Sequence, residues 1–196
     1  MRLKRGNTIL SLGFPEICAA AFMIGAGEGK TLLIALISAI AHEGGHILTM
    51  FLFGSGVGEF RFSPVGGMIR FSRQTLSYKK DIISAFAGPA VSGAAAGLLY
   101  LIYRRHPDDI LLQAAITNTL YAAMNLLPVR PLDGYRILRG ILYNAGKIDA
   151  EKRLRAAGVF TVMIIILLFS FLCAEWRFNA SLFIFTAFLI LYLDES

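Results

Sequence analysis

Charged residues are scarce in this chain. Asp, Glu, Lys and Arg make up 16% of its 196 residues, whereas hydrophobic residues make up 56%. A soluble globular domain usually carries roughly a quarter of charged residues. The shortage of charge therefore argues against a soluble protein and favours a chain that is embedded in a membrane.

Cysteine and histidine are also rare. The two cysteines, Cys18 and Cys173, are isolated in apolar surroundings, which excludes a disulfide framework or a cysteine metal site and is typical of small core residues. The chain also lacks internal repeats, low-complexity linkers and any segment that resembles a PDZ or CBS domain. We therefore expect one transmembrane core domain over residues 1–196.

Long apolar runs are present instead. A bilayer-spanning helix needs roughly 17 to 25 predominantly apolar residues. Such runs occupy 31–53, 82–103, 110–128, 156–174 and 179–193, and a shorter one occupies 14–27. The sequence thus predicts a mainly α polytopic membrane protein with about six transmembrane helices. A cleavable signal peptide is the alternative for the first run, but Pro15 and Glu16 interrupt it.

The basic residues predict an orientation. If the N-terminus is cytoplasmic, 15 of the 19 lysines and arginines fall on the cytoplasmic side of these spans, as the positive-inside rule requires. The net charge of +6 is then an orientation signal and does not indicate nucleic-acid binding. We expect a prokaryotic plasma-membrane protein with both termini in the cytoplasm. The basic stretch 138–155 is expected to lie against anionic headgroups.

The stretch "AIAHEGGHIL" places three ionisable residues inside an apolar span. In a helix, His42 and His46 share one face, as two nitrogen ligands of zinc require. Glu43 then suits a general base that takes a proton from the attacking water. A chance match is the alternative, but ionisable groups inside a membrane are costly and usually functional.

A catalytic zinc needs a third protein ligand. The remaining histidine, His106 in "YRRHPDD", falls on the outer side of the predicted topology and is expected to be a solvated loop residue. Asp133 in "LLPVRPLDG" falls on the inner side, where Pro128 and Pro131 stop a regular helix and Gly134 permits a sharp turn. Asp133 is the predicted ligand, and an ordinary interfacial turn is the alternative.

"HEGGH" followed by "NLLPVRPLDG" resembles the site-2 protease family of intramembrane zinc metalloproteases. That family pairs HExxH in one span with N-x-x-P-x-x-x-x-D-G in another, and the layout is most similar to that of its sporulation member, which processes a pro-sigma factor, without the C-terminal regulatory domain. The resemblance implies a metalloendopeptidase with one zinc ion per chain. It implies that His42, His46 and Asp133 bind the zinc, that Glu43 is the catalytic base, and that Asn125 contacts substrate.

One element departs from the family pattern. Members often carry A-G-P-x-x-N, whereas "AGPAVSG" has Ser92 in place of the asparagine, so we assign Ser92 no site role. Gly88, Ser92 and Ala96 recur at every fourth residue, a spacing that favours close helix packing. In "HEGGH", the pair Gly44 and Gly45 weakens a helix but lets another backbone approach.

Alternating residues over 58–72 predict a β-hairpin, whose edge could accept a substrate strand. An amphipathic interfacial loop is the alternative. The family resemblance favours residues 8–13 as a third strand, with the first span starting near residue 14. A first span that starts near residue 8 is the alternative, and it would bury Glu16 in the membrane.

The sequence therefore predicts an intramembrane zinc metalloprotease that hydrolyses a membrane-spanning or membrane-associated protein near the cytoplasmic face. A non-proteolytic zinc-binding scaffold is one alternative, although metal binding alone would not need Glu43. A metal transporter is another, but the further spans lack the polar residues and repeated halves that it predicts. An inhibitory or regulatory membrane partner is neither supported nor excluded.

Overall fold

The structure is a computed structural model that forms two compact units, residues 1–123 and 124–196, which are described separately. It describes residues 2–5, 8–11, 27, 29–54, 57–63, 66–71 and 77–175. The spans expected at 14–27 and 179–193 lie outside the described residues.

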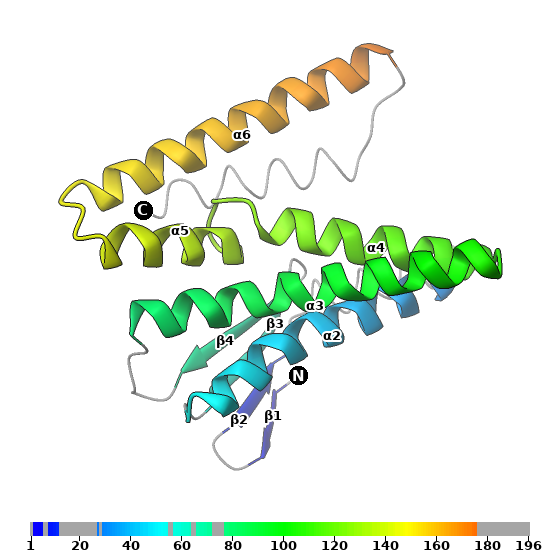
Figure 1. Cartoon of the computed structure of the whole chain (residues 1–196), viewed down its shortest axis with the longest axis horizontal. Helices are drawn as coiled ribbons and strands as arrows, with labels where there is room; N and C mark the ends of the chain where they lie inside the picture. The colour runs from blue at the N-terminus through cyan, green and yellow to red at the C-terminus, as the bar shows by residue number, and fades with distance from the viewer. Residues whose placement is uncertain are drawn as a thin grey trace. The chain divides into compact units, whose positions relative to one another are not determined.

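The first unit is built on long helices (Figure 1). Helix α2 covers Gly29–Leu52, α3 covers Tyr78–Arg105, and α4 begins at Asp109 and ends at Asn125. Among the described residues, α2 and α3 are long and apolar enough to cross a membrane. These helices confirm the prediction of a mainly helical membrane protein, and α4 corresponds to the run predicted at 110–128.

The outer surface of α2 is apolar, and its buried face is polar. Leu33, Ile37 and Ile40 are exposed, with Ile40 64% exposed, whereas His42 is 2% exposed. A soluble helix shows the opposite arrangement. A helix that turns its aliphatic side chains outward and its imidazole inward is adapted to lipid on the outside.

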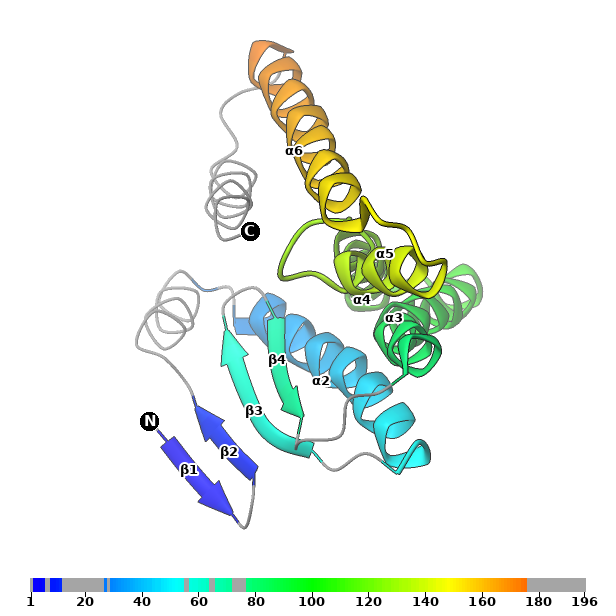
Figure 2. The ribbon, with the colours of Figure 1, turned by 90° about the vertical axis from the view of Figure 1, so that its left-hand side faces the viewer.

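Four strands form one sheet in the order β1-β2-β3-β4, shown in Figure 2. The pairing is antiparallel between β1 and β2, parallel between β2 and β3, and antiparallel with an irregularity near Val57 between β3 and β4. The strand β4 contacts α2. Strands are therefore present at both predicted places, and β2 favours a first span that starts after it. The bounds are Arg2–Arg5 for β1, Thr8–Ser11 for β2, Val57–Ser63 for β3 and Gly66–Phe71 for β4.

The second unit contains α5, Asp133–Asn144, and α6, Ala150–Glu175. Helix α5 ends where Gly146 adopts a φ of 63°, a left-handed conformation that glycine enters without strain. The turn sends the chain into α6, which covers the run predicted at 156–174. The residues before α5 form an irregular loop in which Val129 and Leu132 are buried.

Candidate metal centre

Helices α2 and α3 approach closely at one glycine. A Cβ atom on Gly45 would lie 2.7 Å from the carbonyl oxygen of Ala87 and 2.9 Å from a methyl carbon of Val91, so this approach requires a residue without a side chain. The neighbouring Gly44 faces open space. The close contact explains one glycine of "HEGGH", and it brings the histidines on either side against α3.

The backbone of α3 orients His46. Its Nδ1 atom lies 2.7 Å from the main-chain oxygen of Ser84. A carbonyl oxygen only accepts hydrogen bonds, so Nδ1 must carry the proton and donate. The lone pair of a neutral His46 is therefore on Nε2, the nitrogen that remains for a metal.

A side chain of α3 contacts His42. The Nδ1 atom of His42 lies 3.0 Å from Oγ of Ser92, and both residues are buried. Ser92, to which the sequence assigned no site role, therefore touches a predicted metal ligand. The sequence pattern could not indicate this contact, because it does not fix which side of α3 faces α2.

Gly88 leaves space at the two outer imidazole nitrogens. A Cβ atom on Gly88 would lie 2.7 Å from Nε2 of His42 and closer still to Nε2 of His46. Both Nε2 atoms thus lie close to the backbone of α3 at Gly88, an approach that a side chain on residue 88 would prevent. This space and the two oriented nitrogens fit a bound metal ion.

Asp133 is the first residue of α5 and is 8% exposed. The next residue, Gly134, is so close to the main-chain oxygens of Leu126 and Leu127 that a Cβ atom would overlap them. Nη1 of Arg136 lies 3.5 Å from Oδ1 of Asp133. The predicted Asp-Gly turn thus depends on glycine to fold the preceding loop back onto the start of α5.

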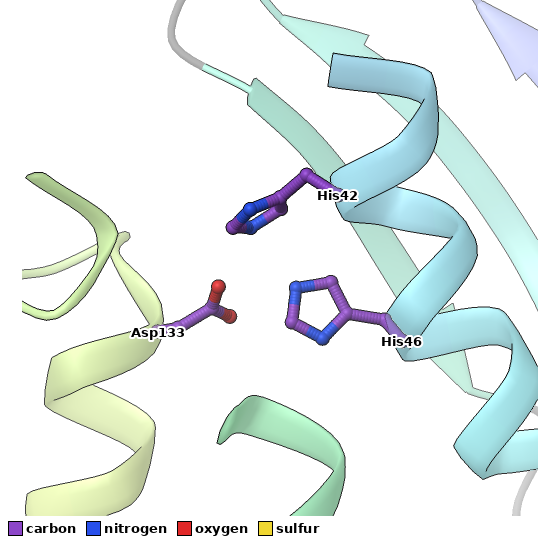
Figure 3. A group of neighbouring side chains, drawn as sticks. All are labelled: His42, His46 and Asp133. Carbon is purple, nitrogen blue, oxygen red and sulfur yellow. The ribbon is translucent and has the colours of Figure 1, made fainter. Parts of the chain in front are cut away.

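His42, His46 and Asp133 each offer one ligand atom, and these atoms lie within 4.8 Å of one another (Figure 3). Two imidazole nitrogens and one carboxylate oxygen are a ligand set of catalytic zinc. This confirms the predicted zinc site. His106 follows the end of α3, is exposed, and lies about 27 Å along the helix from Gly88, since an α-helix rises about 1.5 Å per residue.

The other predicted site residues lie on α2 and α4. Glu43 is 7% exposed and follows His42 on α2. Asn125 is the half-buried last residue of α4, and the roles of Glu43 and Asn125 stay predictions. The sequence missed Tyr121, whose ring centroid lies 5.9 Å from that of His42.

Comparison with known proteins points to one family. Residues 104–169 match the model of peptidase family M50. Rip3 of Mycobacterium tuberculosis, which is named as a zinc metalloprotease, is 30% identical over 164 residues, covering 80% of this chain and 40% of Rip3. A zinc metalloprotease of Methanocaldococcus jannaschii is 28% identical over 116 residues, covering 56% of this chain and 33% of that protein. The chain thus spans less than half the length of these relatives.

A solved structure has the same fold. The site-2 protease from Methanocaldococcus jannaschii matches with a TM-score of 0.74 over 100% of this chain and 94% of that chain, at 22% sequence identity. The family match over residues 104–169, the named relatives and the ligand set together support a zinc metalloprotease of the M50 type, and the solved structure shows the fold.

Proposed function

We propose that this chain is an intramembrane zinc metalloprotease that hydrolyses a peptide bond of a membrane-spanning or membrane-associated protein near the cytoplasmic face. The observation that carries the proposal is the convergence of His42, His46 and Asp133 beside a buried Glu43, within helices of membrane-spanning length. Ionisable groups at this depth are costly and therefore indicate a function.

His42, His46 and Asp133 would hold the zinc ion. When bound, zinc lowers the pKa of water and polarises a peptide carbonyl, so that hydrolysis proceeds near neutral pH. Glu43 then accepts the proton of the attacking water and returns it to the departing amine. Its burial on the ligand helix α2 suits this role, because a base in a dry site keeps its proton for the leaving group.

Substrate binding is assigned to two elements. Asn125 ends α4 and carries a carboxamide, which can both donate to and accept from an unwound peptide backbone. The strand β4 is an edge of the described sheet and contacts the zinc helix α2. An extended substrate could add to that edge by main-chain hydrogen bonds, which would expose a peptide bond that a helical segment conceals.

The orientation follows from charge. With both termini in the cytoplasm, most lysines and arginines lie on the cytoplasmic side. His46 lies about 9 Å along α2 from Leu52, because each residue rises about 1.5 Å. We therefore propose cleavage inside the membrane but toward its cytoplasmic side. The layout resembles that of the sporulation protease, and we propose the same general task of regulated intramembrane proteolysis.

A zinc-binding scaffold without proteolytic activity is the second candidate. It would use the same three ligands, and it would place no demand on Glu43. The burial of that carboxylate, on the residue after His42, favours the protease, because a carboxylate without a role would be expensive to retain at this depth.

The test combines metal analysis with cleavage. Wild type and Glu43→Gln in detergent should each bind about one zinc per chain, whereas Asp133→Ala should lose it. In liposomes that carry single-span test substrates, wild type should cleave at least one substrate. Glu43→Gln should be about 10² to 10⁴ times slower, the usual contribution of a general base.

Three results would contradict this assignment. Full zinc in Asp133→Ala would mean that another residue supplies the third ligand. Equal cleavage by wild type and Glu43→Gln would remove Glu43 from the chemistry. Zinc binding without cleavage of any substrate, including substrates captured by crosslinking to Glu43→Gln, would favour the scaffold.

A further inference from the structure

We propose that Ser92 is a positioning residue, whose hydroxyl accepts a hydrogen bond from Nδ1 of His42 and so directs Nε2 toward the metal. The inference rests on the proposed zinc site, but not on proteolytic activity. It starts from the 3.0 Å contact between the two side chains.

The two histidines are held in different ways. His46 is held by the main-chain oxygen of Ser84, which no substitution at position 84 removes. His42 is held by the side-chain hydroxyl of Ser92, which one substitution removes completely. The orientation of His42 is thus the part of this ligand set that depends on the side chain at a position in another helix.

Three small residues form one face of α3 toward the ligands. Ser84, Gly88 and Ser92 are spaced four residues apart, so they lie above one another on the helix. Ser84 contacts His46, Gly88 leaves room at both Nε2 atoms, and Ser92 contacts His42. What the sequence presents as a packing stripe is therefore also the surface that orients the metal ligands.

Burial makes the Ser92 hydroxyl difficult to replace. Ser92 has no exposed surface and His42 is 2% exposed. In such a site, water cannot readily take the place of a lost partner, and a buried donor without an acceptor is costly. Without the hydroxyl, the imidazole of His42 would rotate or shift its proton to Nε2, and either change removes a metal ligand.

The experiment measures zinc affinity by competition with a chromophoric chelator in detergent. Ser92→Ala and the nearly isosteric Ser92→Cys should bind zinc about 10 to 100 times more weakly, the usual loss when a group that orients a ligand is removed. Ser92→Thr, which keeps the hydroxyl, should bind more tightly than Ser92→Ala. The absorption spectrum of the Co²⁺-substituted protein should change in Ser92→Ala, because it reports the ligand geometry.

Ser38→Ala is the matched control. Ser38 is also buried, lies one helical turn before His42, and its hydroxyl accepts a hydrogen bond from Asn118 on α4. This variant should keep the wild-type zinc affinity and Co²⁺ spectrum, even if its stability falls.

Wild-type zinc affinity in both Ser92→Ala and Ser92→Cys would overturn the inference. An equal loss of affinity in Ser38→Ala would also overturn it, because the effect would then be general helix packing. A protein that binds zinc tightly but cleaves nothing would contradict the proposed protease alone. The inference about Ser92 would still be supported in that case if Ser92→Ala bound zinc more weakly than wild type.

Discussion

Helix α2 buries polar side chains at two interfaces, one with α4 and one with α3. Toward α4, Asn118 donates from Nδ2 to Ser38 Oγ at 2.9 Å, and Gln113 donates from Nε2 to Thr31 Oγ1 at 2.9 Å. These groups are neutral. Each pair joins two helices, which is the usual role of such residues in membrane proteins.

Toward α3, the polar groups are ionisable, and we propose that they bind a metal ion. The Nδ1 atoms of His42 and His46 contact Ser92 and Ser84 on α3, and both Nε2 atoms lie close to Gly88. The burial of polar side chains alone therefore does not distinguish hydrogen bonds that join two helices from an active site. The distinction lies in ligand atoms that converge to within 4.8 Å of one another.

Gly88→Ala should have the largest effect on this comparison. The added methyl group would occupy the space beside both Nε2 atoms. Zinc affinity should fall by at least about 100-fold, at or beyond the upper end of effects from residues around a metal site. Chelator competition measures it, and an affinity near that of wild type would show that the metal does not use this space.

The adjacent residues Gly44 and Gly45 allow a comparison of the outward face of α2 with the face that contacts α3. Gly45→Ala would drive a methyl group into the backbone of α3 at Ala87 and should lower the free energy of unfolding by about 1 to 3 kcal/mol, as overpacking does. Gly44→Ala meets open space and should raise it by up to about 1 kcal/mol, the helix preference of alanine over glycine. Denaturation in mixed micelles measures both, and equal effects would refute the assigned close contact.

Asn118→Leu tests the hydrogen bonding between α2 and α4. It removes the bond to Ser38 but also a buried Oδ1 atom that has no hydrogen-bond partner in the described part of the chain. The free energy of unfolding should fall by only about 0.6 kcal/mol, the average for such bonds between membrane helices. Zinc affinity, measured on the same sample, should not change. A large loss of zinc would mean that this interface also positions the ligands.

Ser84→Ala should have the smallest effect. The variant keeps the main-chain oxygen that accepts from His46 and loses only a 3.4 Å contact between the hydroxyls of Thr49 and Ser84. Zinc affinity should stay within about twofold of wild type, because a long hydrogen bond contributes less than about 1 kcal/mol. A loss as large as that expected for Ser92→Ala would contradict the different anchoring of the two histidines.

Local patterns carried the parts of the site that could be predicted. The spacing of His42 and His46 defines one helix face whatever surrounds it. The prolines and Gly134 mark an irregular loop through backbone restrictions that belong to those residues alone. These patterns, with the shortage of histidine, led to Asp133 as the third ligand, which the cluster confirms.

The contacts of α3 and α4 could not be predicted in the same way. Both helices are apolar on most sides, so periodicity does not fix which face turns toward α2. The sequence indicated that Gly88, Ser92 and Ala96 form a packing surface. Whether this surface contacts aliphatic or imidazole groups depends on how α3 is rotated about its axis. Asn118, Tyr121 and Ser92 acquire their partners only through that rotation.

The parallel pairing of β2 with β3 has a consequence for biogenesis. Leu10 pairs with Phe60, so the connection between the two strands contains the whole of α2. Parallel strands cannot be joined by a tight turn, and their contact forms only after a long loop has closed. During synthesis, the whole of α2 must therefore be made before β2 and β3 can pair. A nascent chain that stops before β3 contains both histidines, but it has neither the sheet nor α3, whose residues contact them.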